Sequence, residues 1–187
     1  MIVAKELAVE GAYQGVCLEA GPGTLTAVAG PSGSGRTSLL LTLAGRMKPT
    51  GGTLAVAGHT RRGAIRKVVA PALVDGMTDL DRALTVHEHL RERRRKPYGQ
   101  ALETVGLAVA PGTRAGELDR EQQVRLGLAM ALLDEPRVIV ADNVDAGLPR
   151  QARQAVWRLL QRLAARGTTV VASCVHPEGP CDHLVEL

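Results

Sequence analysis

The chain has 187 residues, of which 45% are hydrophobic and 22% charged, a balance that excludes an intrinsically disordered chain and allows one globular domain with its own core. Its three cysteines show no C-x-x-C spacing, which argues against a disulfide framework, and no apolar run reaches the roughly 18 to 20 residues of a membrane span. The formal net charge of +4 suits an anionic ligand or an anionic membrane surface.

Apolar runs separated by glycine, proline and small polar residues predict strands that alternate with helices. In chain order, the expected elements are strands at residues 3–9, 15–19 and 25–29, a helix at 37–43, strands at 53–57 and 68–69, a mainly helical segment at 85–130 broken near Pro97 and Pro111–Gly112, a strand at 138–142, a helix from Pro149 to Gly167, and a strand at 168–172. This alternation implies a mostly parallel sheet that is interrupted by a helical insert.

The segment Gly30–Thr37 matches the pattern G-x-x-x-x-G-K-[ST] of a phosphate-binding loop, except that Arg36 replaces the lysine. Its glycines let successive backbone N–H groups turn towards phosphate oxygens, and the N-terminus of the following helix adds a partial positive charge. A glycine-rich turn that binds nothing would not explain the strand before it, the helix after it and the hydroxyl of Thr37, which would ligate Mg²⁺. The predicted nucleotide-binding residues are Gly30, Ser32, Gly33, Ser34, Gly35, Arg36, Thr37 and Ser38.

Along nearly its whole length the chain resembles the ATP-binding cassette (ABC) family. Beyond the P-loop, the matching segments in order are Leu43–Gly45, Lys48–Gly52, Thr85–Leu90, Leu118–Leu126 over the signature L-S-G-G-Q-Q-x-R-L, Val138–Asp142 over the Walker B strand, Asp145–Leu148 over the turn T-A-G-L-D, and Gly167–Val171 over the last core strand. The resemblance implies an α/β P-loop NTPase fold, with a RecA-like core at about 1–84 and 136–187 and a shortened helical subdomain at about 85–135. It also implies ATP as the ligand, with Mg²⁺ held by Thr37 and Asp142.

Two departures from the family pattern bear on hydrolysis and assembly. Asn143 stands where the family has a glutamate that polarises the attacking water, and the loss of general-base help lowers a rate by roughly 10²- to 10⁴-fold. In the signature, Asp119, Arg120 and Glu121 replace the S-G-G that grips the γ-phosphate of the partner subunit's ATP. A carboxylate about 4 Å from a phosphate charge costs on the order of 4 kcal/mol at an effective dielectric constant near 20, so ATP is not expected to close a homodimer.

Further catalytic and sensing positions are altered. The glutamine of the family's Q-loop is missing around Ala70–Ala72, and Pro149 replaces the last aspartate of the D-loop. The switch histidine should fall at Val175, with His176 one place later. We therefore expect a degenerate member of the family, in which Asn143 and His176 lie at or near catalytic positions without an assigned catalytic role.

Three features allow two interpretations each. Tyr13 is also counted among the predicted nucleotide-binding residues, because it could stack on adenine, as an early aromatic residue does in the family; it could equally be a half-buried strand residue. The basic segment Arg91–Lys96 could contact nucleic acid or form a solvated helix face or loop; with no Phe, two Tyr and one Trp, stacking platforms for single strands are missing, so nucleic acid is not expected. The cysteines and histidines within Cys174–His183 do not have a common zinc-ligand spacing and are interpreted as a strand end and a loop.

Two functions are compatible with these observations. The first is the ATPase subunit of a transporter, which hydrolyses ATP weakly and docks onto a separate membrane protein at the cytoplasmic face of the cell membrane. The second is a catalytically deficient nucleotide-binding pseudoenzyme that regulates or scaffolds within a heterodimer. Both predict a dimer with another cassette, and the altered signature favours a heterodimer. A P-loop kinase would not explain the signature-like segment.

Overall fold

The computed structural model describes residues 1–74, 76–93 and 97–187, so part of the basic segment Arg91–Lys96 lies outside the described residues. The strands are β1 (Ile2–Val9), β2 (Tyr13–Ala20), β3 (Leu25–Ala29), β4 (Gly51–Val56), β5 (Val69–Ala72), β6 (Val138–Ala141), β7 (Thr169–Cys174) and β8 (His183–Glu186). The helices are α1 (Arg36–Leu43), α2 (Arg62–Ile65), α3 (Val86–Arg93), α4 (Gly99–Val105), α5 (Arg120–Leu132) and α6 (Arg150–Ala165), with a 3-10 turn at Ala115–Glu117.

The larger sheet has five parallel strands in the order β5-β6-β7-β3-β8. Because all five run in one direction, the carboxyl ends of β3, β6 and β7 meet at one edge of the sheet, which is where α/β proteins bind ligands. The loop after β3 is the predicted phosphate cradle, and β6 leads into Asp142. The parallel sheet and the α/β fold class are confirmed.

Alternate residues of the central strands face two separate cores, as a strand period of two requires. On β6, Val138 and Val140 belong to the core shared with α1, whereas Ile139 and Ala141 belong to the core shared with α5 and α6. All four side chains are at most 2% exposed, so the strand is buried on both faces. A continuous apolar run such as Val138–Ala141 is the pattern that burial on both faces produces.

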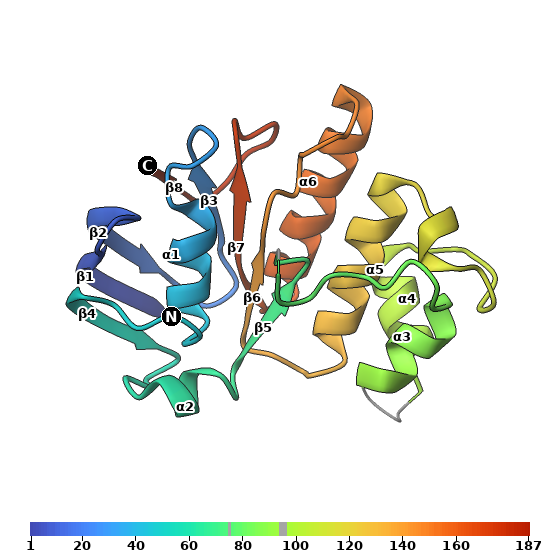
Figure 1. Cartoon of the computed structure of the whole chain (residues 1–187), viewed down its shortest axis with the longest axis horizontal. Coiled ribbons are helices and arrows are strands. Elements are labelled where there is room, and N and C mark those ends of the chain that lie inside the picture. Colours follow the sequence, from blue (N-terminus) through green and yellow to red (C-terminus); the bar gives the residue numbers. More distant parts are fainter. Residues whose placement is uncertain (75, 94–96) are drawn as a thin grey trace.

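Helices cover both faces of the five-stranded sheet (Figure 1). On one face lies α1, which is followed outwards by a three-stranded antiparallel sheet in the order β2-β1-β4. On the other face lie α5 and α6, and α3 and α4 pack on α5 at the far side of the molecule. No helix in the described part of the chain is long and apolar enough to cross a membrane.

The expected elements are present, with three differences. The strand expected at Val68–Val69 extends over Val69–Ala72 and includes Pro71. A proline is tolerated there because β5 is the edge strand of its sheet and the missing N–H breaks no ladder on the open side. The short helix α2 and the strand β8 were not expected. His183 therefore begins a strand that pairs with β3 and does not lie in a loop.

Gly127 joins α5 closely to the segment after β5, and we expect a substitution there to destabilise the protein. A Cβ atom at Gly127 would lie 2.5 Å from Cγ of Leu73. Overpacking of this kind costs about 1 to 3 kcal/mol, against about 1 kcal/mol gained in helix propensity. Gly127→Ala should therefore lower the free energy of unfolding in urea. Gly99→Ala in α4, where a Cβ meets no atom of the described residues within 4 Å, is the matched control and should not lower it. An unchanged midpoint for Gly127→Ala would contradict this packing.

Candidate functional site

The loop between β3 and α1 is the predicted phosphate cradle, and its backbone conformation requires glycine at two positions. Gly33 and Gly35 have positive φ angles of 84° and 93°, a region that other residues rarely adopt. A Cβ atom at Gly35 would lie 2.4 Å from the carbonyl oxygen of Ala12, because the loop packs against the turn between β1 and β2. Among the described residues no side chain caps α1, so its first N–H groups are open to an anion.

The cradle contains buried polar atoms that have no partner within the described part of the chain. Arg36 is 8% exposed, and its Nη1 has no hydrogen-bond partner; the same holds for Oγ of Ser34. An unsatisfied buried donor is costly, and the cost is larger for a charged group. A phosphate would satisfy these atoms. Of the other predicted residues, Ser32 is exposed beside Gly33, and Ser38 is half-buried in α1.

The predicted metal residues meet at the carboxyl edge of the sheet. Asp142 is 1% exposed, and its Oδ2 accepts a hydrogen bond of 2.6 Å from Oγ1 of Thr37. Its Oδ1 accepts one from Oγ of Ser173 at the end of β7. No described residue forms an ion pair with this buried carboxylate, so a cation would compensate its charge. Hydroxyl and carboxylate oxygens are ligands that Mg²⁺ prefers, so these residues fit that ion.

Asn143 follows Asp142 in a strained backbone conformation. Its φ is 46°, in the left-handed region that asparagine tolerates better than most residues, and its N–H donates to Oγ of Ser173 at 2.8 Å. The residue is half-buried and directly follows Asp142 in the chain. An amide can orient a water molecule by hydrogen bonding, but it has no site that takes up a proton near neutral pH.

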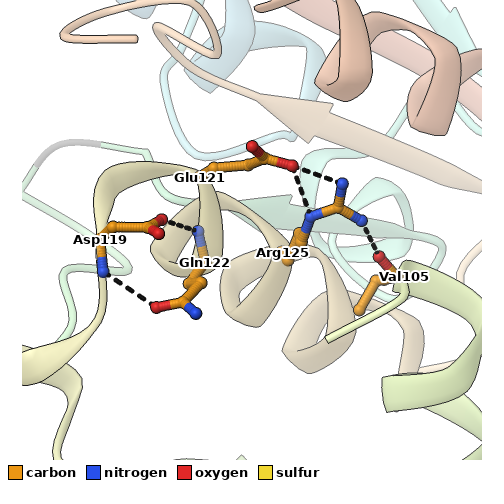
Figure 2. Close-up of polar contacts among 5 residues, drawn as sticks. All are labelled: Val105, Asp119, Glu121, Gln122 and Arg125. Carbon is orange, nitrogen blue, oxygen red and sulfur yellow. Dashed lines mark hydrogen bonds and ion pairs between the residues drawn. The ribbon is translucent and has the colours of Figure 1, made fainter. Parts of the chain in front are cut away.

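The signature-like segment contains the N-terminus of α5, which Asp119 caps (Figure 2). The Asp119 carboxylate accepts the backbone N–H of Gln122 at 2.8 Å, and Oε1 of Gln122 accepts the N–H of Asp119 at 3.0 Å. This reciprocal arrangement is a capping box. The partial positive charge of the helix N-terminus is therefore already compensated by a carboxylate of the same chain.

The second carboxylate of the segment is paired within the chain. Glu121 accepts from Nε and Nη2 of Arg125, at 3.0 and 2.5 Å, and Nη1 of Arg125 donates to the carbonyl of Val105 (Figure 2). The expectation that both carboxylates repel a phosphate needs correction, because Arg125 neutralises Glu121. The repulsion then depends on Asp119, which forms no ion pair with a described residue.

Arg120, between these two carboxylates in the sequence, points to the loop after β6. Its Nε donates to the carbonyl of Ala146 at 3.2 Å and its Nη2 to that of Asn143 at 3.4 Å. These bonds connect the start of α5 to the loop after β6. Arg120 is thus engaged by backbone carbonyls of its own chain.

The end of β7 lies beside the same loop. The N–H of Val175 donates to Oδ2 of Asp145 at 3.1 Å, while the side chains of Val175 and His176 are exposed. Burial, and secondarily the nearby Asp145 carboxylate, raise the pKa of the Cys174 thiol to about 12, so it is neutral at physiological pH. Sequence reasoning missed Ser173, and it placed Asp145 in the turn after Val138–Asp142 without its contact with Val175, because each contact joins segments about 30 residues apart.

Tyr13 lies beside the cradle, but its ring is in the core. The residue is 6% exposed and packs in the cluster around α1, and burial raises the pKa of its hydroxyl. Of the two interpretations of Tyr13, the packed strand residue agrees with this position. A cavity of about 500 Å³ opens next to it, between the first residues of β2, Ser34 of the cradle and β8. This cavity is large enough for a nucleoside.

Comparison with known protein families identifies the family to which this chain belongs. The family profile described as "ABC transporter" matches residues 13–146, well over half of the chain. The chain belongs to the ABC transporter family. The phosphate cradle at 30–37, the signature-like segment at 118–126 and Asp142 all lie within the matched range.

Several ABC proteins of known sequence are similar to the chain. The probable multidrug ABC transporter ATP-binding protein YbhF of Escherichia coli is 30% identical over 163 residues, which cover 81% of this chain and 28% of that protein. The Nod factor export ATP-binding protein I of Paraburkholderia xenovorans is 31% identical, covering 84% and 55%. The Fe(3+) ions import ATP-binding protein FbpC 2 of Rhodococcus jostii is 35% identical, covering 88% and 51%. The chain thus spans between about a quarter and a half of these relatives.

Solved structures confirm the ABC fold. A putative ABC transporter ATP-binding protein from Pyrococcus furiosus superposes with a TM-score of 0.83 at 19% identity, covering 100% of this chain and 96% of that one. The structure of cbiO1 from Clostridium perfringens, part of the ABC transporter complex cbiONQ, superposes with a TM-score of 0.79 at 20% identity. The match covers 94% of this chain and 78% of that one.

Proposed function

We propose that the chain is the ATP-binding subunit of an ABC transporter, that it binds Mg-ATP at the P-loop and that it hydrolyses ATP weakly. The observation that carries this proposal is a pair of uncompensated buried charges at the cradle. Within the described part of the chain, Nη1 of Arg36 has no hydrogen-bond partner, and the Asp142 carboxylate contacts two hydroxyl groups and no cation. A triphosphate with a magnesium ion would compensate both.

Each residue of the site has a chemical role in this proposal. The backbone N–H groups of the P-loop bind the phosphates, and the Arg36 guanidinium contacts them as a planar fork instead of a compact ammonium. Thr37 and Asp142 hold Mg²⁺, which supplies charge compensation on the phosphates when bound. Asn143 orients the attacking water through its amide without removing a proton, and this limits turnover.

Membership of the family suggests which proteins this chain binds. The names of the related proteins describe them as ATP-binding proteins of export and import systems. We propose that this chain likewise docks onto a separate membrane protein at the cytoplasmic face of the cell membrane and pairs with a second cassette. Residues 85–135 would form the helical subdomain, and 1–84 with 136–187 the ATPase core. The Asp119 carboxylate at the start of α5 favours a heterodimer, in which the partner has an intact signature.

A second candidate function is a nucleotide-binding pseudoenzyme that regulates or scaffolds a competent ATPase. The observations that favour it are Asn143 at the position of the catalytic base and the capping of α5 by Asp119. Both functions require nucleotide binding. What distinguishes them is the rate of ATP turnover within the assembled pair.

Mg-ATP should bind to the isolated chain and raise its melting temperature, since a ligand at 100 times its Kd adds about 2.7 kcal/mol of stability. Arg36→Gln removes the charged fork and should weaken binding at least about tenfold, because a charged hydrogen bond contributes roughly 1.5 to 3 kcal/mol. Gly35→Asp should abolish binding, since its Cβ collides with the Ala12 carbonyl. Calorimetry at millimolar Mg-ATP with neither heat nor thermal shift, and with Gly35→Asp indistinguishable from wild type, would refute the proposal.

A further inference from the structure

Ser173 is a fully buried polar residue in the sheet. Its hydroxyl contacts two groups, one of which can only donate a hydrogen bond and one of which can only accept. Its Oγ contacts Oδ1 of Asp142, and the backbone N–H of Asn143 approaches the same Oγ at 2.8 Å. The N–H can only donate, so Oγ accepts that bond. An ionised carboxylate can only accept, so the single hydroxyl proton of Ser173 is directed to Asp142.

The two oxygens of Asp142 are thereby held from opposite sides of the site. Oγ1 of Thr37, on the first turn of α1, donates to Oδ2, whereas Oγ of Ser173, on β7, donates to Oδ1. Thr37 is itself an expected ligand of Mg²⁺, so its hydroxyl oxygen would also have to coordinate the ion. Ser173 is 0% exposed and adjoins the carboxylate from the strand next to β6. It can hold Asp142 with or without the ion.

Ser173 also fixes the residues that follow Asp142. Besides the Asn143 N–H on its hydroxyl, its carbonyl accepts the N–H of Val144 at 3.1 Å. Asn143 adopts a positive φ, a conformation that persists when surrounding contacts enforce it. One serine thus orients the metal-binding carboxylate and the turn that presents residue 143.

We propose that Ser173 is a positioning residue for the magnesium site, acting through Asp142. The inference rests on the proposed binding of Mg-ATP and adds a residue that the P-loop and Walker B patterns do not include. Residues that orient a metal ligand typically contribute about 10- to 100-fold to metal affinity. A purely structural role in the sheet would change the stability of the protein and not the effect of Mg²⁺ on ATP binding.

The test is the ATP affinity of the full chain, measured by calorimetry in excess Mg²⁺ and again in EDTA. Ser173→Ala should reduce the Mg²⁺-dependent gain in ATP affinity about 10- to 100-fold and leave the affinity in EDTA unchanged within about twofold. Ser173→Cys keeps the shape of the side chain at a slightly larger volume but donates only weakly, so it should show the same loss if the alanine variant folds poorly. The rescue variant Ser173→Thr retains the hydroxyl and should recover the Mg²⁺ effect.

Thr26→Val is the matched control. Thr26 lies on β3, the other neighbour of β7, is 0% exposed, and its hydroxyl has no hydrogen-bond partner among the described residues. Its loss should not alter the Mg²⁺ effect. A Mg²⁺ effect in Ser173→Ala equal to that of wild type would overturn the inference and leave the proposed function intact. Wild type that binds ATP equally with and without Mg²⁺ would also overturn it, whereas wild type that binds no nucleotide would overturn the proposed function first.

Discussion

Purified alone, the chain should hydrolyse ATP far more slowly than an intact cassette ATPase. By its resemblance to the family, Asn143 stands where the general base is expected. Its backbone N–H donates to Ser173, and its side-chain amide cannot accept a proton from water. In the presence of a cassette with an intact signature, Asn143→Glu should raise steady-state turnover by roughly 10²- to 10⁴-fold, the usual contribution of general-base catalysis. The readout is phosphate release at saturating Mg-ATP.

Asn143→Gln is the matched control for this prediction, because it has the size of glutamate without the carboxylate. It should stay as slow as wild type, and Asp142→Ala should abolish what activity remains by removing the metal ligand. Turnover of several per second by wild type, lost in Asp142→Ala, would show that the amide does not limit hydrolysis. In that case the transporter function would stand and the pseudoenzyme alternative would fall.

Mg-ATP should not drive homodimerisation of this chain. In the family each ATP lies between the P-loop of one cassette and the signature of the other, so both sites of a homodimer would face Asp119. Its carboxylate already caps α5. A second anion about 4 Å away would cost on the order of 4 kcal/mol at each site, at an effective dielectric constant near 20. Glu121 adds less to this repulsion, since Arg125 pairs with it.

Light scattering with and without Mg-ATP measures this directly, and the expected mass is that of the monomer in both conditions. Asn143→Glu should leave the result unchanged, because it restores a base and not the signature. Replacing Asp119, Arg120 and Glu121 together by Ser-Gly-Gly should permit an ATP-dependent dimer, and serine at position 119 still caps the helix. An ATP-dependent dimer of the wild-type chain, lost on removing nucleotide, would refute the electrostatic argument and favour an ordinary transporter motor.

Local chemistry determined much of this protein from the sequence alone. The P-loop could be placed because positive φ angles favour glycine at Gly33 and Gly35, and because the close approach of the Ala12 carbonyl also demands it at Gly35. The strand Val138–Ala141 could be placed because a run of four apolar residues indicates burial on both faces. The cap of Asp119 and the Glu121–Arg125 pair also lie within one helical turn, so the spacings of three and four residues contain that information.

Only the tertiary structure decided the contacts between distant segments. Ser173 meets Asp142 because β6 and β7 are parallel neighbours, and no pattern within either strand encodes that pairing. The strand β8 was missed because it is short, alternates between half-buried and exposed residues, and becomes a strand by pairing with β3. Tyr13 was ambiguous because a strand residue next to a ligand site can face either the site or the core. The packing of β2 above α1 places it in the core.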